Sequence, residues 1–494
     1  MSKLVLLFLF IFTSCFAREA YEIKNLWNRL DPASIPQGFA FYDLYPESVE
    51  GKKALQRLKK LLGVEESISI ELLAPQFTHL QGACFTQEGL QLVEKLAYHL
   101  PNRRLKGYFA KSEAEVLALP PEEIDLGKAL LFSQLGEREG AERQAREYSA
   151  LLDLMALEIL AYLPEHPTPM DKIVATNRLI FEEMGFRFPP HSIYAKDIDL
   201  YTFLPSVMDN HLGVCLGVAA LYLAVAQRID LPLEAITPPG HIYVRYREGE
   251  TCVNIETTAR GIDLPTEHYL NMNTYYLPVR GIKEVVGFTH VNEGSLHLQN
   301  EEYEKAIASY QKAFLYLPEE ILVKELLGFC YLFTGKKEEG EAFLRKIPLE
   351  PAVGSIKKDT MVEDYFNQKV DEEGLKAVFM MVDETLESVL KKQKRLQRVV
   401  KRYPEFREGL EHLAVTWVQM RRPKEALQVL EKFHAIDPTH PTIEYYLAVL
   451  QGERHHYAAA WDYLHVAEKL TLAYHFSPKA LKELRQQLLP CCPE

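Results

Sequence analysis

The chain has little that would suit it to nucleic acid, to a metal or to a phosphate-bearing cofactor. Acidic residues outnumber basic ones by 69 to 56, for a formal charge of −13. A chain without a basic surplus is poorly suited to neutralise phosphates. The seven cysteines are scattered without metal-ligand or disulfide-framework spacing, and no glycine-rich phosphate loop occurs. We therefore expect no nucleic-acid partner, no bound metal and no cofactor.

Long apolar runs are also scarce. The marked one, Leu4 to Phe12, has nine residues, too few to span about 30 Å of hydrocarbon. The preceding Lys3 and the small residues that follow are typical of a secretory signal peptide over residues 1–17. Cleavage after its last residue is one interpretation, and lipidation at Cys15 is the other. We expect an exported protein, periplasmic or secreted, that contacts a membrane only if it is lipidated at Cys15.

With 494 residues, the chain is too long for one hydrophobic core and should contain several domains. Its hydrophobic fraction of 47% is ordinary for globular proteins. The patterns predict an α+β domain followed by all-α repeats. Our division is a signal peptide at 1–17, a helical N-terminal segment at 18–140, the α+β domain at 141–285, helical repeats at 287–474 and a C-terminal tail at 475–494.

Most of the chemistry that the sequence suggests lies within residues 205–261. Cys215 follows Gly213, and from there apolar residues recur at helical spacing, at Val218, Leu221, Tyr222 and Val225. The thiol should therefore lie in the first turn of a helix, where free N–H groups and the helix dipole favour an anion. Cysteine nucleophiles occupy such positions.

Two strands should follow this helix. Residues 241–246 and 251–257 each alternate polar with apolar side chains, and Glu248-Gly249 between them predicts a hairpin turn. A hairpin closed symmetrically at that turn pairs residues whose numbers sum to 497.

That register selects the acid that meets the imidazole. It places His241 opposite Glu256, with Cβ atoms about 4.5–5.5 Å apart, and Tyr243 opposite Asn254. A cysteine, a histidine and a carboxylate are the parts of a thiol hydrolase or acyltransferase. We therefore take Cys215, His241 and Glu256 as the candidate catalytic residues.

Two asparagines near these residues have open roles. Asn254 is the alternative orienting group, since an amide does this in papain-like proteases. Asn210 lies upstream of the nucleophile, where a donor to an oxyanion could sit, although the Cys215 backbone N–H is the more direct donor. A turn formed by Asp209 and Asn210 is the competing interpretation.

The motifs, in this order, resemble the transglutaminase-like superfamily, and especially bacterial members with tetratricopeptide (TPR) repeats. The matching stretches are Asn177–Phe186, Gly213-Val-Cys-Leu-Gly217 with Leu221-Tyr-Leu223, Pro239-Gly-His241 with Val244-Arg-Tyr246, and Asn254-Ile-Glu-Thr-Thr258. The resemblance covers about residues 145–285 and implies a papain-like core, in which a cysteine-bearing helix packs on an antiparallel sheet. One departure is Glu256, where the family usually has Asp. Some branches of the superfamily have lost catalytic residues, so the resemblance also allows an inactive protein.

From about residue 287 the chain is repetitive. Small residues and prolines recur at the offsets of a 34-residue helix–turn–helix unit, which is the TPR signature. They are Gly294, Ala306, Ala313 and Pro318, then Gly328 and Gly340, then Ala414, Ala426 and Pro438, then Ala448 and Ala460. Four units result, at 287–320, 321–350, 407–440 and 441–474, with degenerate repeats expected within 358–403. Such repeats stack into a solenoid whose concave face binds a protein or peptide.

These inferences predict an exported thiol enzyme that acts on amide or peptide bonds, with repeats that bind a protein partner. The sequence leaves open whether the acyl group passes to water or to an amine. Peptides or cell-envelope material would suit an exported location. The alternative is a catalytically inactive scaffold whose transglutaminase-like fold positions ligands for the repeats.

Overall fold

The structure of the protein is a computed structural model. It describes residues 20–78, 85–189, 201–348, 351, 354–358, 360–383 and 385–492. The predicted signal peptide at 1–17, including Cys15, lies outside the described residues. Within the described ranges, no helix is both long and apolar enough to cross a bilayer.

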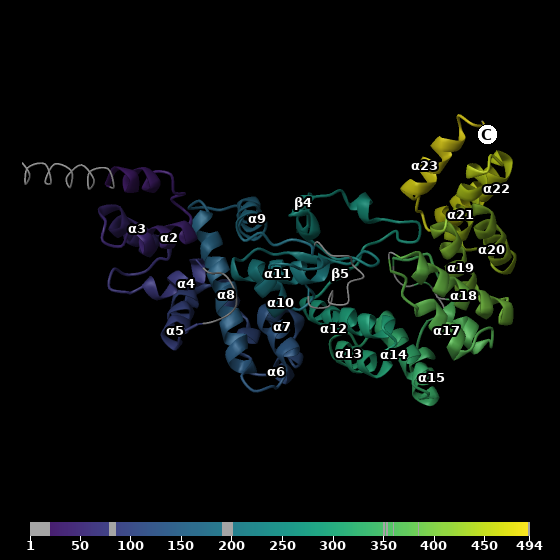
Figure 1. The fold of residues 1–494 in the computed structure, drawn as a ribbon, viewed down its shortest axis with the longest axis horizontal. Helices are drawn as coiled ribbons and strands as arrows, with labels where there is room; N and C mark the ends of the chain where they lie inside the picture. The colour runs from purple at the N-terminus through teal and green to yellow at the C-terminus, as the bar shows by residue number, and fades with distance from the viewer. Residues whose placement is uncertain are drawn as a thin grey trace, which may run out of the picture. The chain divides into compact units, whose positions relative to one another are not determined.

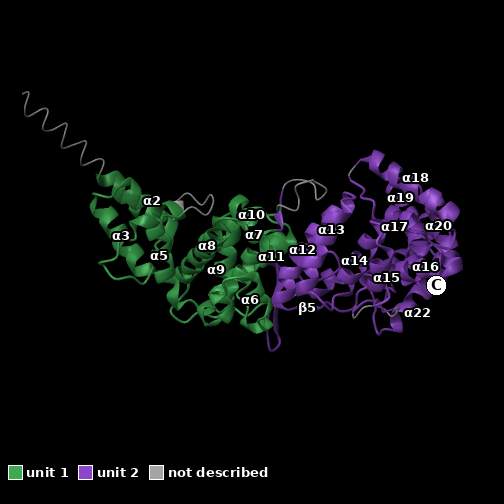
Figure 2. Cartoon of the chain, turned by 90° about the horizontal axis from the view of Figure 1, so that it is seen from below, with its two compact units in different colours: residues 1–188, 203–233, 257–261 green, residues 189–202, 234–256, 262–494 purple. Residues whose placement is uncertain are grey.

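The chain divides into two compact units, shown in Figure 2. Unit 1 lies within residues 1–188, 203–233 and 257–261, and unit 2 within residues 189–202, 234–256 and 262–494. The α+β region therefore contributes to both units: its cysteine-bearing helix belongs to unit 1 and its sheet to unit 2.

Unit 1 is helical. Its α-helices are α2 (Ile35–Leu44), α3 (Val49–Leu61), α4 (Ala74–Thr78), α5 (Gln87–Leu96), α6 (Glu113–Leu117), α7 (Leu126–Leu135), α8 (Ala141–Tyr162), α9 (Pro169–Asn177), α10 (Leu204–Asn210) and α11 (Cys215–Arg228). Several begin at a Ser, Thr or Asp whose side chain accepts a backbone N–H of the first turn, as at Ser48, Thr86 and Asp125. A π-helical turn, η6 (Arg178–Glu183), continues α9.

The core of unit 1 forms around α8 and α11. Helix α11 packs on α7, α8 and α10 (Figure 1). Nearly all of its side chains from Leu216 to Arg228 are buried. A helix that is apolar on all sides belongs in a core, because it has no face to offer to water. Cys215, its first residue, is only half-buried.

Unit 2 begins with an antiparallel sheet of five strands in the order β4-β3-β2-β1-β5. The strands are β1 (Glu234–Ile236), β2 (Tyr243–Glu248), β3 (Thr251–Glu256), β4 (Ile262–Asp263) and β5 (Val279–Arg280). The hairpin that the alternating pattern predicts is β2–β3.

The predicted register of this hairpin is wrong: the turn lies one residue later than predicted, and each residue pairs with one two positions farther along the other strand. Val244 pairs with Ile255 and Glu248 with Thr251, so the paired residue numbers sum to 499. The two turn residues are therefore Gly249 and Glu250, and Gly249 has φ +57°. Two-residue hairpin turns need a positive φ at their first central position, which glycine adopts without strain. The glycine therefore opens the turn, whereas the sequence-based register placed it second.

The repeats form paired helices along unit 2 (Figure 1). The pairs are α12 (Ile282–Gln299) with α13 (Tyr303–Tyr316), α14 (Ile321–Phe333) with α15 (Lys337–Leu344), α19 (Arg407–Gln419) with α20 (Pro423–Ile436), and α21 (Pro441–Glu453) with α22 (Tyr457–Leu472). Between the second and third pairs lie α16 (Met361–Phe366), α17 (Glu372–Phe379) and α18 (Leu386–Arg402). The prediction of an α+β region followed by all-α repeats is confirmed.

The small residues of the repeat lie where the paired helices touch. A Cβ added to Gly294 would come within 2.5 Å of the Tyr310 ring, and one added to Gly340 within 2.8 Å of the Gly328 carbonyl oxygen. Neither position has room for a side chain. Because the backbones of paired helices approach this closely, each repeat needs small residues at these positions, and this need explains the 34-residue period.

The last segment, predicted as a tail from residue 475, contains a further helix, α23 (Lys479–Leu488). Leu481, Leu484 and Leu488 face one way at helical spacing and are buried against α21 and α22. This helix covers an apolar face of the final repeat, as the capping helices of solenoids do.

Candidate active site

His241 lies two residues before β2, at the end of the turn Pro238-Pro-Gly-His241. Gly240 has φ +71°, and the His241 backbone N–H donates to the Pro238 carbonyl oxygen at 3.0 Å. The turn brings the imidazole over the end of β3, where its Nε2 is 2.8 Å from Oε2 of Glu256. The Glu256 side chain is only 5% exposed, whereas that of His241 is 27% exposed. The acid is thus held inside the protein and the imidazole remains accessible.

The pairing of His241 with Glu256 therefore survives the error in register. In the observed register Tyr243 is the first residue of β2, and a register that sums to 499 places it opposite Glu256. His241 approaches the carboxylate from beyond the strand end. A register shift of two in the paired sum keeps every side chain on its predicted face of the sheet, because the side-chain period is two. Asn254 and Glu256 lie on that same face, so the preference for Glu256 over Asn254 rested on the register and not on the face.

Asn254, the alternative orienting group, is engaged elsewhere. Its side-chain amide donates to the Leu264 carbonyl oxygen at 2.6 Å and to Thr266 Oγ1 at 3.2 Å. Its backbone N–H donates to Asp263 Oδ1 at 2.9 Å. The residue is buried and holds the loop after β4 against β3.

Tyr269 is a member of this cluster that sequence reasoning missed. It ends the short turn η9 (Thr266–Tyr269), and its hydroxyl donates to Oε2 of Glu256 at 2.9 Å. Its ring stacks on that of Tyr243, with centroids 4.0 Å apart, and lies 6.1 Å from the His241 ring and nearly parallel to it. Burial and then the bond to Glu256 raise the pKa of Tyr269, so the phenol stays protonated and remains a donor. Glu256 thus accepts one hydrogen bond from the imidazole and one from the phenol.

Cys215 is the first residue of α11 and is a free thiol. The approach to it is tight: a Cβ added to Gly213 would lie 2.5 Å from Val218 Cγ2. The Gly213 backbone N–H donates to the Arg187 carbonyl oxygen at 3.1 Å. The glycine is therefore needed for close packing before the helix. A first-turn position leaves backbone N–H groups of α11 without partners in the helix, which favours a nearby anion.

The Cys215 helix is fixed by hydrogen bonds within unit 1. The Tyr222 hydroxyl donates to Asn177 Oδ1 at 2.9 Å, and the Asn177 amide donates to the Gly261 carbonyl oxygen at 3.2 Å. Gly261 has φ +76°, and a Cβ there would come within 2.4 Å of the Asn177 side chain. Asn177 opens the stretch 177–186 whose motif the sequence singled out, and its side chain bridges α11 to the segment after β3.

Asn210, the second asparagine with an open role, ends α10. Its amide donates to the Ser206 carbonyl oxygen at 2.8 Å and to Ser206 Oγ at 3.3 Å. The neighbouring Asp209 accepts a hydrogen bond from the Tyr148 hydroxyl at 2.7 Å. Both donors of the Asn210 amide thus point back into its own helix, and the chain turns only at His211, whose φ is +53°.

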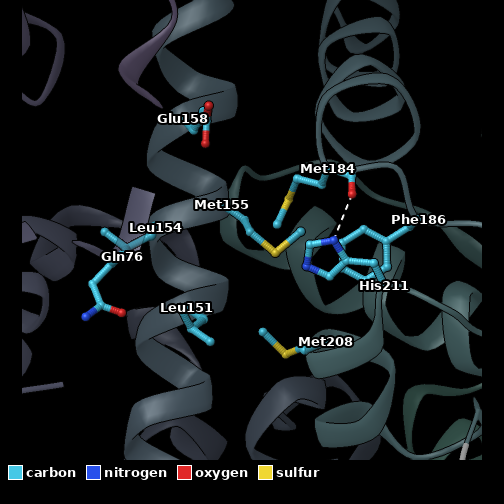
Figure 3. A pocket seen from close by; sticks show the side chains of 9 residues that line it. All are labelled: Gln76, Leu151, Leu154, Met155, Glu158, Met184, Phe186, Met208 and His211. Atoms are coloured by element: carbon cyan, nitrogen blue, oxygen red, sulfur yellow. Dashed lines mark hydrogen bonds between the residues drawn. The ribbon is translucent and has the colours of Figure 1, made fainter. Parts of the chain in front are cut away.

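A small cavity lies in unit 1 beside His211 (Figure 3). Its walls are mostly apolar, and its volume of about 20 Å³ has room for one water-sized guest. The lining residues are Gln76, Leu151, Leu154, Met155, Glu158, Met184, Phe186, Met208 and His211. His211 Nδ1 is hydrogen-bonded to the Met184 carbonyl oxygen at 2.8 Å. This cavity is too small for a peptide or an organic substrate. Across the described ranges, no three His, Cys, Asp or Glu side chains cluster as metal ligands would.

Two family models match parts of this chain. A family model described as the transglutaminase-like superfamily matches residues 146–275, a range that includes Cys215, His241 and Glu256. Residues 146–275 are a transglutaminase-like domain. A second model, the tetratricopeptide repeat, matches residues 289–316, within α12 and α13. The transglutaminase-like domain is thus followed directly by TPR repeats.

Two curated relatives match over a short stretch. Both are named UPF0162 protein and come from Xylella fastidiosa, strains Temecula1 and 9a5c, and each is 32% identical to this chain over 74 residues. The match covers 15% of this chain and 25% of each relative. This chain therefore spans about a quarter of the length of the curated relatives it matches.

Several solved structures resemble part of the chain. YrrB, described as a TPR protein with an unusual peptide-binding site, is 16% identical with a TM-score of 0.22, over 40% of this chain and 92% of that chain. Pseudomonas aeruginosa PilF is 16% identical with a TM-score of 0.20, over 43% of this chain and 94% of that chain. These TM-scores are low, and the TPR assignment rests on the family model and the helix pairs.

Proposed function

We propose that this protein is a thiol enzyme that cleaves or transfers amide or peptide bonds, with Cys215 as nucleophile, His241 as general base and Glu256 as the acid that orients the imidazole. The transglutaminase-like domain supports the general kind of protein, and one family model spans all three residues. The observation that carries the proposal is the 2.8 Å hydrogen bond between His241 Nε2 and Glu256 Oε2.

This hydrogen bond has the geometry that an orienting acid requires. A buried carboxylate at one ring nitrogen fixes the tautomer and leaves the other nitrogen as the base. Glu256 is buried and receives a second hydrogen bond from Tyr269, so its position is determined from two sides. The side chain of Glu256, one methylene longer than the Asp that is usual in the family, still lies within hydrogen-bonding distance of the imidazole.

The proposed reaction has two half-reactions. The Cys215 sulfur attacks the carbonyl carbon of a carboxamide or peptide, and His241 takes the thiol proton. The tetrahedral intermediate collapses to a thioester as the C–N bond breaks, and His241 gives its proton to the leaving amine. Water or a second amine then attacks the thioester, His241 takes a proton from this nucleophile, and the thiol leaves with it. The Cys215 backbone N–H is the natural donor to the oxyanion.

The repeats and the N-terminus complete the proposal. TPR repeats are protein-interaction modules, so we propose that their concave face binds a protein or peptide partner. We also propose export, with residues 1–17 removed as a signal peptide or with Cys15 lipidated. Peptides or cell-envelope amides are the substrates that fit this location. Fractionation of cells that make the full chain checks the location.

Trapping of the acyl-enzyme tests the chemistry. The full chain, without residues 1–17, is incubated with peptide carboxamides and hydroxylamine, and hydroxamate and ammonia are measured. We expect both products from the native protein and neither from Cys215→Ala. Cys252→Ala is the matched control, because Cys252 is a free, exposed cysteine in β3. Hydroxamate formation by Cys215→Ala at the native rate would exclude Cys215 as the nucleophile.

Glu256→Gln tests the orienting acid. It retains the shape of the side chain and removes the negative charge that stabilises imidazolium. In other triads, a comparable change lowers kcat by up to about 10⁴. Glu248→Gln is the matched control: Glu248 also ends a strand of the hairpin and accepts a hydrogen bond from a tyrosine, Tyr246, at 2.5 Å. We expect a large loss of kcat only in Glu256→Gln, and equal rates in the two variants would refute the assigned role.

An inactive scaffold is the second candidate, and the length of the repeat region favours it. The repeats and the helices between them extend from α12 to α22. A pull-down with the full chain identifies partners, and the same experiment with Cys215→Ala asks whether the thiol matters to them. If partners are retained, no substrate yields a thioester and Cys215→Ala has no phenotype, the scaffold is the correct description.

A further inference from the structure

The segment that follows Tyr269 is seated on the repeats. Met272 is 8% exposed and packs in one apolar cluster with residues of α21 and α22, including Ala448, Trp461 and Leu464. A methionine side chain fits such an irregular apolar site well because it is unbranched and flexible. The loop of the transglutaminase-like domain therefore has an anchor within the repeat region of the same unit.

Polar contacts hold the same segment from two directions. The Thr442 hydroxyl, at the start of α21, donates to Asn273 Oδ1 at 2.5 Å. The Ile356 N–H donates to the Asn273 carbonyl oxygen at 2.8 Å, and the Tyr275 N–H donates to the Gly354 carbonyl oxygen at 3.0 Å. Thr274 and Ser355 thereby form an antiparallel bridge. The segment is paired as a short strand would be.

Gly354 is the residue that permits this pairing. Its φ is +85°, and an added Cβ would lie 2.7 Å from the Tyr276 carbonyl oxygen. That contact is to backbone, which cannot rotate away as a side chain could. An alanine here would be strained twice, by its φ and by the collision. Gly354→Ala is therefore a local way to disturb the seat of the segment.

The contacts of residues 272–276 with the repeats lie close along the chain to the site of His241 and Glu256. Met272 is three positions after Tyr269, and a chain spans at most about 3.6 Å per position, so the two Cα atoms are roughly 11 Å apart or less. Tyr269 donates to Glu256 and stacks beside His241. A shift of the seated segment by a few ångströms would be passed to the phenol.

We propose that the contacts of Met272–Tyr276 with the repeats position Tyr269, and through it Glu256 and His241, so that the repeat region is part of what holds the catalytic pair in register. The catalytic part of this inference rests on the proposed function. Tyr269, Met272 and Gly354 are positioning residues, because they act through Glu256 and need not touch substrate.

The experiment uses the full chain with 3-fluorotyrosine at position 269 and the variant Gly354→Ala. Gly335→Ala is the matched control: Gly335 also lies in the repeat region with positive φ, +78°, but an added Cβ would meet nothing within 4 Å. Thr442→Val is a milder second variant, which removes only the hydroxyl that holds Asn273. We expect the ¹⁹F resonance of residue 269 to shift or broaden in Gly354→Ala and in Thr442→Val and to stay unchanged in Gly335→Ala. An unchanged resonance in folded Gly354→Ala and Thr442→Val would overturn the proposal.

Kinetics give a second, separate readout. Tyr269→Phe should lower kcat by about tenfold to a hundredfold, the range for loss of one hydrogen bond to a charged group, with little change in KM. Gly354→Ala should lower kcat by no more than this, and the double variant should fall no further than Tyr269→Phe. If the losses of kcat in Gly354→Ala and Tyr269→Phe add in the double variant, the contacts of residues 272–276 do not act through Tyr269, and the proposed coupling is overturned. If the native chain has no activity but the ¹⁹F shift occurs, the proposed function fails and the positioning of Tyr269 stands.

Discussion

Arg228 offers the sharpest prediction about stability, because it is a fully buried charge at the end of the Cys215 helix. Its Nε donates to Asp153 Oδ1 at 2.9 Å and its Nη1 lies 3.8 Å from Asp125 Oδ1, with both Arg228 and Asp125 at 0% side-chain exposure. Arg103 also binds Asp153, with Nη1 to Oδ1 at 2.7 Å, and Asn102 donates to Asp125 at 2.7 Å. Asp125 thus has one buried cation beside it, whereas Asp153 has both Arg228 and the partly buried Arg103.

Arg228→Met retains most of the volume and removes the charge. Burial alone would raise the pKa of Asp125, but Arg228 and the hydrogen bonds from Lys128 and Asn102 outweigh it and hold the pKa below its ordinary value. Without Arg228 the carboxylate is left buried and largely uncompensated, which costs about 3–5 kcal/mol. The folded-state pKa of Asp125 then rises, so the deficit should be largest at neutral pH and should shrink as the pH falls toward 4. Asp125→Asn in the same chain should recover much of it.

Urea unfolding followed by circular dichroism, at pH 7 and near pH 4.5, measures these changes. Arg422→Met is the control, because Arg422 is an exposed arginine paired with Glu425, and it should shift the free energy of unfolding by less than about 0.5 kcal/mol. A loss below about 1 kcal/mol at pH 7 in Arg228→Met would refute the reasoning. So would a double variant, with Asp125→Asn, that is no more stable than the single one.

Two further buried groups predict opposite pH dependences. Burial and the nearby Glu183 raise the pKa of Glu158 to about 8, so its contribution to stability is present below pH 4.5 and lost as the pH rises through 8. Glu158→Gln should remove that loss, at most about 5 kcal/mol by the 1.36 kcal/mol per unit relation, and parallel pH profiles in urea would contradict this. Burial lowers the pKa of Lys392 to about 8, and its Nζ donates to the Val378 carbonyl oxygen at 2.8 Å. The contribution of Lys392 to stability is present above pH 10.5 and lost as the pH falls through 8. Lys392→Met should therefore raise the urea midpoint more at pH 7 than at pH 10. A larger rise at pH 10 than at pH 7 would be evidence against a buried cation.

Local patterns predicted much of the site because local physics forms it. The helical spacing after Cys215 predicted α11, and alternation placed His241 and Glu256 on one face of a hairpin. The register error arose at Gly249, where the turn needs a positive φ that a symmetric guess did not consider. Which face of the sheet a side chain occupies depends only on whether its number is odd or even. The prediction of the face was therefore correct although the predicted pairing was wrong.

The parts that sequence reasoning missed depend on contacts without a period. Tyr269 meets Glu256 across 13 residues, and no pattern in residues 257–268 marks a phenol as its donor. Met272 and Asn273 sit against α21, far along the chain. No local sequence pattern distinguishes a loop methionine that is buried against a distant helix from one that is exposed. The division of the α+β region between two units is likewise a property of the whole set of contacts.

The seat of Asn273 on Thr442 has a consequence for the order of folding. The two residues are 169 positions apart, so the contact closes a long loop of chain. At translation rates of about 5–20 residues per second, the partner of Asn273 is made roughly 10 to 30 s after it. The hairpin that carries His241 and Glu256 can pair before the last repeats are synthesised. The contacts of the segment after Tyr269 with α21 and α22 can form only later. Chains that stop short of α21 would therefore carry a formed hairpin and lack the contacts of Asn273 with Thr442 and of Met272 with α21 and α22.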